Sequence, residues 1–169
     1  DSLGLAAAVD YLRAEVDSSA FPGAVLAVGR HGRLALLAPV GRYGVGEKDR
    51  VVPRTLYDLA SITKAVGTTT ACMLLVDDEK LALDAPVQRY LPAFQGRGKE
   101  LVTVRQLLTH SSGLPAWRPL YRETATRAEA LALVDTTPLD WPPGERFVYS
   151  DLGAIVLMQV VEAIAGVPI

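Results

Sequence analysis

The sequence predicts an α+β fold in which a helix and a short antiparallel sheet precede a longer helical part. Three patterns predict it: apolar residues at helical spacing near the start, two apolar runs around a turn, and capped apolar segments from Thr55 onward. The chain has 169 residues, 50% of them hydrophobic and 21% charged, which is typical of a globular domain with a hydrophobic core. We expect residues 1–169 to belong to one domain, divided into residues 1–54 and residues 55–169.

Residues 1–54 are predicted to form a helix followed by a β-hairpin. The opening stretch "DSLGLAAAVDYLRAEV" carries apolar side chains at helical spacing, at Leu5, Val9, Leu12 and Val16. After Phe-Pro-Gly, the stretch "AVLAVGRHGRLALLAPVGRYG" holds two apolar runs, with Gly32 supplying the turn between them. Both strands are apolar and each would expose an edge, so the predicted sheet is incomplete.

Residues 55–169 are predicted to be mainly helical. An apolar helix is expected near residues 60–76, although it contains three consecutive threonines. Because threonine is a poor helix former, we expect tertiary burial to hold this helix. A short helix should follow, with Thr103 as its N-cap and Gly113 at its end.

Two more helices are expected towards the end of the chain. In "TRAEALALV", Thr126 and Glu129 have the spacing of a capping box, which marks a helix start. The apolar segment "DLGAIVLMQVVEAIAG" is predicted to be a helix closed by Gly166 and Pro168.

The composition excludes several classes of partner and site. A net charge of −2 gives no general attraction to nucleic acid, and the longest apolar runs are too short to span a membrane. Cys72 is the only cysteine, so no internal disulfide can form, and we expect it to be buried in a helix. One cysteine and two histidines predict no metal site. The compartment is expected to be the periplasm or the exterior if a leader was removed, and otherwise the cytoplasm.

Ser61 and Lys64 are the first candidates for chemistry. A serine becomes a useful nucleophile when a neighbouring base takes its proton, and a helix N-terminus favours a developing oxyanion. Lys64 lies one turn further along on the same helix face, and burial could lower its pKa enough to relay a proton. The alternative is a helix cap followed by a solvated lysine, because S-x-x-K arises about once by chance in a chain this long.

Three stretches favour the catalytic interpretation. They are "LYDLASITKAVGTTTACMLLVDDEKLALDAPVQRYLP", "VTVRQLLTHSSGLP" and "PPGERFVYSDLGAIVLMQVVEAIAG". In this order they resemble motif regions of the serine β-lactamase and penicillin-binding-protein superfamily. The closest resemblance is to the branch of class C β-lactamases, D-alanyl-D-alanine carboxypeptidases and esterases. It runs from about Phe21 to the last residue and implies a β-lactamase/transpeptidase-like fold.

The resemblance implies that the chain is the N-terminal part of such a domain. In the family, strands from the C-terminal part finish the sheet, and one of them carries a third motif of Lys or His, a small residue and Gly. No such motif follows Asp151 in this sequence. The expected partners are therefore a small ester, peptide or β-lactam substrate and a C-terminal remainder of the same domain.

The resemblance also implies roles for the matching residues. Ser61 would be acylated by a carbonyl substrate, its N–H would form half of an oxyanion hole, and Lys64 would hold and relay protons. Tyr149 would act as the general base. A phenol is normally a poor base at neutral pH, and a nearby ammonium such as that of Lys64 would lower its pKa. No metal or organic cofactor is implied.

Four other residues lie in or near these motifs. Asp151 stands where the family more often has Asn; a carboxylate cannot donate to a substrate carbonyl, and we expect it to pair with Lys64 and raise its pKa. Trp117 is the aromatic candidate for substrate binding, and Trp141 is an alternative. His110 resembles a structural histidine of the family, so we expect its replacement to affect stability more than chemistry.

Two functional hypotheses remain open from the sequence. The first is a serine hydrolase that forms an acyl-enzyme on Ser61 and acts on esters, D-amino-acid peptides or β-lactams, in that order. The second is a non-catalytic penicillin-recognising sensor or binding module on the same scaffold. A hydrolase releases its acyl group, whereas a sensor keeps it.

Overall fold

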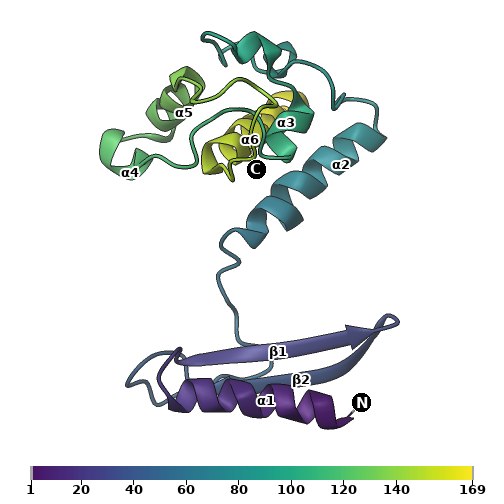
Figure 1. Ribbon diagram of the computed structural model, residues 1–169, viewed down its shortest axis with the longest axis vertical. Coiled ribbons are helices and arrows are strands. Elements are labelled where there is room, and N and C mark those ends of the chain that lie inside the picture. Colours follow the sequence, from purple (N-terminus) through teal and green to yellow (C-terminus); the bar gives the residue numbers. More distant parts are fainter. Residues whose placement is uncertain (1, 169) are drawn as a thin grey trace. The chain divides into compact units, whose positions relative to one another are not determined.

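The computed structural model describes residues 2–168, which fall into two compact units, Asp1–Asp58 and Leu59–Ile169. The first unit holds one helix and a two-stranded antiparallel sheet, and the second is helical (Figure 1). The predicted α+β class and the order of its elements are confirmed.

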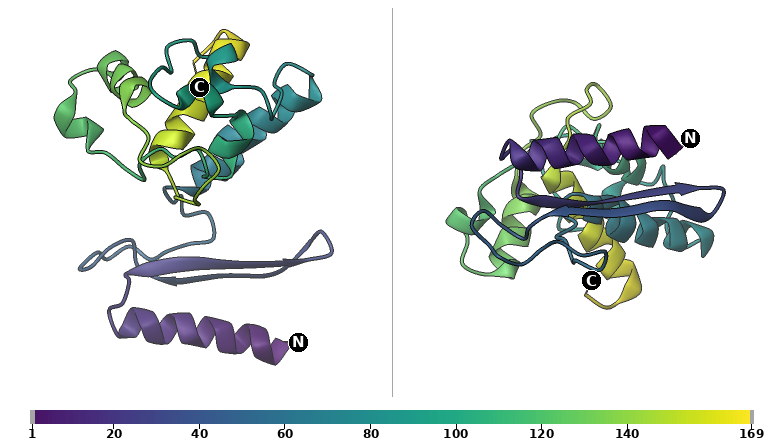
Figure 2. Two further views of the ribbon diagram at one scale, coloured as in Figure 1. Left: turned by 45° about the horizontal axis from the view of Figure 1, so that its top comes forward. Right: turned by 90° about the horizontal axis from the view of Figure 1, so that it is seen from below.

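The first unit consists of α1 (Ser2–Asp17) and a hairpin of β1 (Gly23–Arg30) and β2 (Arg33–Gly41), with α1 lying along the hairpin (Figure 2). The strands pair antiparallel from Gly23 opposite Gly41 to Arg30 opposite Arg33. His31 and Gly32 form the two-residue turn with φ of 51° and 71°. Positive φ at both positions matches the twist of the strands, so the predicted hairpin and its glycine are confirmed.

The amphipathic character of α1 is also confirmed. Val9 is buried, and the other three members of the predicted apolar stripe are partly buried: Leu5, Leu12 and Val16. This stripe provides the surface that contacts the strands.

The second unit contains a π-helical segment, five α-helices and short 3₁₀ turns. The π-helical segment Lys64–Thr69 runs directly into α2 (Thr70–Asp77), and we call the two together the 64–77 helix. The remaining helices are α3 (Val104–Leu108), α4 (Leu120–Glu123), α5 (Arg127–Thr136) and α6 (Asp151–Ala165).

The core of the second unit is built around α6. This helix contacts α2, α3, α5 and the π-helical segment. It contributes seven buried residues: Leu152, Gly153, Val156, Leu157, Gln159, Val160 and Val161. Because α6 is apolar on most of its circumference, it is stable only when other helices surround it.

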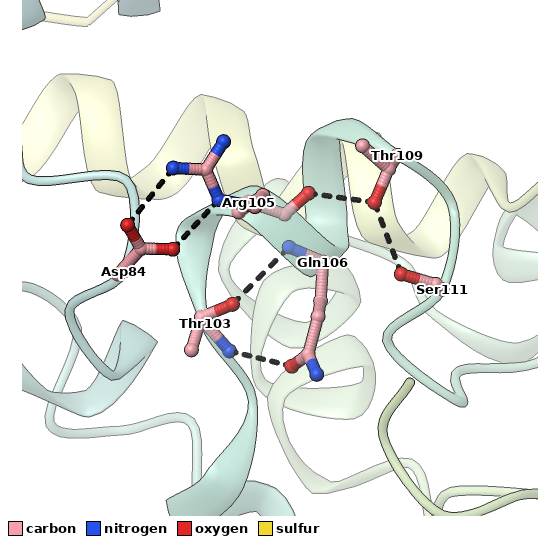
Figure 3. Close-up of polar contacts among 6 residues, drawn as sticks. All are labelled: Asp84, Thr103, Arg105, Gln106, Thr109 and Ser111. Carbon is pink, nitrogen blue, oxygen red and sulfur yellow. Dashed lines mark hydrogen bonds and ion pairs between the residues drawn. The ribbon is translucent and has the colours of Figure 1, made fainter. Parts of the chain in front are cut away.

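The predicted helix boundaries at capping residues are confirmed in three helices. Thr103 accepts from the Gln106 N–H at the start of α3, and the Gln106 side chain accepts from the Thr103 N–H (Figure 3). The same reciprocal pair, Thr126 with Glu129, starts α5. Gly166 follows α6 with φ of 73°, a left-handed conformation that glycine adopts without steric cost.

The predicted end of α3 at Gly113 is wrong. The helix ends at Leu108, and His110 already has a left-handed φ of 54°. Gly113 has another purpose, because a Cβ at this position would lie 2.0 Å from the carbonyl oxygen of Trp141. The Gly113 carbonyl accepts from the Asp140 N–H at 2.8 Å, so the glycine allows two loops to pack backbone against backbone.

The expected burial of the 64–77 helix is confirmed on one face only, where Ala71, Leu75 and Val76 pack against the core with Cys72. Cys72 is its one buried residue, 1% exposed, whereas Val66, Met73 and Leu74 are 56–64% exposed. One face of this helix packs on α6, and the side chains of its opposite face are exposed in the second unit. The expected burial of Cys72 is confirmed, and it raises the pKa of the thiol to about 11.

Candidate active site

Ser61 stands at a sharp turn into the 64–77 helix. Ala60 before it has φ of 44°, an uncommon left-handed conformation for a residue with a Cβ. The Thr63 N–H then donates to the Ala60 carbonyl and the Lys64 N–H to the Ser61 carbonyl, each at 3.1 Å. This turn leaves the Ser61 side chain exposed at the start of the helix.

The structure brings Ser61, Lys64 and Asp151 together. The Lys64 ammonium donates to the Ser61 hydroxyl at 3.1 Å, so the two side chains meet as expected, with Ser61 in the turn that precedes the π-helical segment. The same ammonium lies 2.8 Å from the Asp151 carboxylate at the start of α6. Lys64 therefore links the serine to the N-terminal end of α6.

The pKa of Lys64 is raised above its ordinary value, chiefly by the hydrogen bond to Asp151 and also by Tyr149, against the opposing effect of burial. The prediction that Asp151 pairs with Lys64 and raises its pKa is confirmed. Burial lowers the Lys64 pKa as expected, but the neighbouring carboxylate has the larger effect, so the net shift is upward. Lys64 is therefore a stable ammonium and acts as a hydrogen-bond donor.

Tyr149 completes the polar group around Ser61. The pKa of its phenol is lowered, first by a hydrogen bond with the Ser61 side chain and then by one with Lys64. The Lys64 ammonium lies 5.1 Å from the centre of the Tyr149 ring. The expected lowering of the Tyr149 pKa is confirmed, although Ser61 contributes more than Lys64.

Ser150 fixes the backbone between Tyr149 and Asp151. Its hydroxyl accepts from the Gly153 N–H at 3.0 Å as the N-cap of α6 and donates to the Pro115 carbonyl at 2.6 Å. The Asp151 N–H donates to the Ala116 carbonyl at 2.8 Å. The start of α6 is thus attached to the segment that follows α3.

His110 lies beside Tyr149, a position that sequence reasoning missed. The two ring centres are 4.6 Å apart, and His110 Nδ1 accepts from the Ser150 N–H at 3.1 Å. The pKa of His110 is lowered by burial and by the charge of Lys64, against the opposing effect of Asp151. The stretch "THSSGLP" shows a histidine after a short helix, but nothing local in it indicates a contact with residues 149–150.

The two tryptophans differ in their surroundings. Trp117 is 58% exposed and follows Ala116, whose carbonyl holds the Asp151 N–H. Trp141 is covered by the Arg146 guanidinium, which lies 3.6 Å from the ring centre. Trp117 is therefore the more accessible of the two.

A hollow of about 510 Å³ lies beside the Lys64–Asp151 pair. Its remaining lining is small or apolar: Ala60, Thr63, Gly67, Thr68, Ala154, Ile155 and Met158. One turn of the 64–77 helix and the first turns of α6 form its walls.

Within residues 2–168, no group of three or more His, Cys, Asp or Glu side chains is placed to hold a metal ion. No helix in the same range has the length and apolar character needed to cross a membrane.

Comparison with known proteins places this geometry in a family. The Beta-lactamase family model matches residues 8–169. The N-acetylmuramyl-L-alanine amidase of Bacillus subtilis (strain 168) is 34% identical over 90% of this chain and 39% of its own length. A putative D-alanyl-D-alanine carboxypeptidase of Escherichia coli (strain K12) is 34% identical over 68% of this chain and 30% of its own length.

The fold of this chain is also similar to that of several proteins of known structure. EstCE1, a hydrolase with promiscuous acyltransferase activity, has a TM-score of 0.85 and 29% identity over 97% of this chain and 48% of its own. The octameric penicillin-binding protein homologue from Pyrococcus abyssi has a TM-score of 0.81 and 29% identity over 94% and 39%. A class C β-lactamase has a TM-score of 0.81 and 25% identity over 95% and 44%. The chain spans less than half the length of each of these proteins. It has the β-lactamase/transpeptidase-like fold and belongs to the Beta-lactamase family of serine hydrolases.

Proposed function

We propose that this protein is a serine hydrolase that forms an acyl-enzyme on Ser61. One observation carries the proposal: the Ser61 hydroxyl accepts from the Lys64 ammonium at 3.1 Å and lies beside the Tyr149 phenol, which accepts from Ser61 and from Lys64 and has a lowered pKa. Acyl transfer requires a nucleophile and a base that is ionised near neutral pH, and a nearby cation favours that ionised form. Ser61, Tyr149 and Lys64 supply these three groups.

The reaction would proceed in two proton-balanced steps. Tyr149 as phenolate takes the Ser61 proton while Oγ bonds to the substrate carbonyl carbon, and the phenol then returns that proton to the leaving group. Water then attacks the acyl-enzyme carbonyl while Tyr149 accepts one of its protons. The phenol returns that proton to Ser61 Oγ as the bond from Oγ to the acyl carbon breaks, which releases the acid product and restores both the Ser61 hydroxyl and the Tyr149 phenolate. Lys64 stays charged and stabilises the phenolate, while the Ser61 N–H supplies one donor to the oxyanion.

The surroundings of Asp151 support esters as the first substrate class, ahead of D-amino-acid peptides and β-lactams. Its carboxylate is committed to Lys64 at 2.8 Å and cannot donate a hydrogen bond to a substrate amide carbonyl. The small and apolar walls of the adjacent hollow suit an apolar acyl group. Exposed Trp117 is proposed to contact the substrate, because its neighbour Ala116 holds the start of α6.

A second function is supported by the same carboxylate. If Asp151 does not assist release of the acyl group, Ser61 would retain a penicillin and the protein would act as a penicillin-recognising sensor. The two functions differ only in the lifetime of the acyl-enzyme.

The test is intact mass spectrometry after treatment with a fluorophosphonate and, separately, a penicillin. Both reagents should add once to the wild type and to Ser18→Ala, a control that removes an exposed hydroxyl outside the site. Neither should add to Ser61→Ala. A penicillin adduct that decays supports the hydrolase, one that persists supports the sensor, and no adduct on Ser61 contradicts both.

A further inference from the structure

We propose that His110 is a positioning residue that holds Tyr149 in place through a neutral imidazole. The inference rests on the proposed function in one respect, namely that Tyr149 is the base. It assigns His110 a role in the chemistry beyond the structural one that the sequence indicates.

The first argument is that His110 holds the backbone on both sides of Tyr149. The His110 carbonyl accepts from the Val148 N–H at 2.8 Å, and His110 Nδ1 accepts from the Ser150 N–H at 3.1 Å. One residue therefore fixes both neighbours of the tyrosine. These two hydrogen bonds therefore set the direction in which the Tyr149 side chain points from the backbone.

The second argument is the contact between the rings. The imidazole lies against the Tyr149 ring at 4.6 Å between centres and 42° between planes, with Phe147 edge-on to His110 at 6.0 Å. Tyr149 is 46% exposed, so few contacts restrict its phenol. The imidazole is therefore a main determinant of where that phenol lies relative to Ser61.

The third argument is that hydrogen bonds fix the segment of chain that carries His110. The Arg105 guanidinium on α3 makes a double hydrogen bond to the Asp84 carboxylate, at 2.6 and 2.8 Å. Thr109 donates to the Arg105 carbonyl at 2.9 Å and shares a 3.0 Å hydrogen bond with Ser111 (Figure 3). His110 lies between these two residues in a left-handed conformation that histidine tolerates better than most.

The hydrogen bond to Ser150 requires neutral His110. Nδ1 accepts only when the ring proton is on Nε2, and protonation of Nδ1 would place two donors against each other. The charged groups that face the ring are Lys64, which disfavours the imidazolium, and Asp151, which favours it; Tyr149 is the titratable group in contact. Burial adds to the effect of Lys64, so the pKa of His110 lies below its ordinary value.

Titration of Tyr149 tests the inference without a substrate. The tyrosinate absorbance of each variant is compared with that of the same variant carrying Tyr149→Phe, which isolates this phenol. His110→Ala should raise the Tyr149 pKa toward its ordinary value of 10.0. His110→Asn should keep it low, because the Asn amide oxygen replaces Nδ1 as acceptor and Asn tolerates a left-handed backbone.

His31→Ala is the matched control. His31 is also left-handed, with φ of 51°, but lies in the hairpin turn of the first unit. Alanine should fit the left-handed backbone about as poorly in His31→Ala as in His110→Ala, but His31→Ala should leave the Tyr149 pKa unchanged. An unchanged Tyr149 pKa in His110→Ala would overturn the inference, as would a pKa raised equally in folded His110→Asn.

The rate of Ser61 acylation by the fluorophosphonate supplies a second test. Misplacing a catalytic group costs up to about 100-fold, so His110→Ala should be slower by about 10- to 100-fold at neutral pH. The acylation rate of the wild type should show an additional decrease as pH falls below the ordinary histidine pKa of 6.5, because His110 becomes protonated. The rate of His110→Asn should not show this additional decrease. Identical pH profiles for these two proteins would contradict the inference even if His110→Ala fails to fold. Absence of any Ser61 adduct would refute the proposed function, while the tyrosine titration would still decide the role of His110.

Discussion

The two helices that carry the candidate active site are held in very different ways. Helix α6 has seven buried residues, a side-chain cap from Ser150 and a left-handed Gly166 at its end. The 64–77 helix has one buried residue, Cys72, begins as a π-helix, and receives no side-chain cap from Thr63. Both sequences are apolar, so apolar composition alone does not distinguish a helix in the core from one packed on a single face.

The difference shows how the site is built. Helix α6 and its N-terminal extension present Tyr149 and Asp151 from the packed side, whereas Ser61 and Lys64 belong to the less packed side. The Lys64–Asp151 ion pair at 2.8 Å joins the two sides. Four predictions test this division, from the largest expected effect to the smallest.

The largest effect is expected from Tyr149→Phe, which removes the proton acceptor from the packed side. The rate of Ser61 acylation should fall by about 10²- to 10⁴-fold, the usual contribution of a general base. The melting temperature should stay the same because the residue is 46% exposed. Tyr121→Phe, a change at another exposed tyrosine, is the control, and a loss below about tenfold would exclude Tyr149 as the base.

A stability comparison tests the packing of the two helices. Leu152→Ala in α6 removes a side chain that is 1% exposed and should lower the free energy of unfolding by about 2–5 kcal/mol. Leu74→Ala in the 64–77 helix removes one that is 64% exposed and should change it by less than about 0.5 kcal/mol. Urea unfolding measures both, and equal losses would show that a second layer covers the 64–77 helix.

A smaller effect is expected at the helix starts. Ser150→Ala removes the acceptor of the Gly153 N–H and the donor to the Pro115 carbonyl, so the free energy of unfolding should fall by about 1–2 kcal/mol. Thr63→Ala removes a side chain that makes no capping hydrogen bond and should have little effect. Similar losses in thermal unfolding would mean that the two helix starts do not differ.

The smallest effect is expected from Asp151→Asn, which removes the ion pair between the two sides. The raised pKa of Lys64 means that its stabilising contribution is fully present below its ordinary value of 10.5 and is lost as pH rises through the folded-state value. Asp151→Asn should bring the pKa back toward 10.5 and remove most of this alkaline loss. Unfolding free energy measured against pH checks the change.

The same variant sharpens the substrate proposal. An amide at position 151 can donate to a substrate carbonyl, so turnover of β-lactams should rise relative to that of esters. Kinetic assays with one substrate of each class measure the ratio. An unchanged ratio would show that the carboxylate does not control this preference.

Local features of the site could be predicted from sequence because their causes are local. The spacing of Ser61 and Lys64 brings their side chains together whatever surrounds them, and the 3.1 Å hydrogen bond follows from it. The Thr103 and Thr126 caps depend on residues three positions away. The pairing of Lys64 with Asp151 was expected only because the family resemblance placed the two motifs in one cleft.

Other features could not be predicted because they depend on residues far apart in the chain. The direction of the Lys64 pKa shift depends on whether burial or Asp151 has the larger effect, and the spacing of the motifs does not determine this. The helix was expected to be buried because its threonines are poor helix formers, but burial also depends on which neighbours are present.

The sequence by itself therefore determined the hairpin, most helix starts and the contact between Ser61 and Lys64. These depend on turn chemistry, capping and helical periodicity, which act over a few residues. Only the tertiary structure decided that His110 fixes both neighbours of Tyr149 and that the effect of Asp151 on the Lys64 pKa exceeds that of burial. Hydrogen bonds and charges act through space, and only packing of α3 and the 64–77 helix against α6 brings these groups within their range.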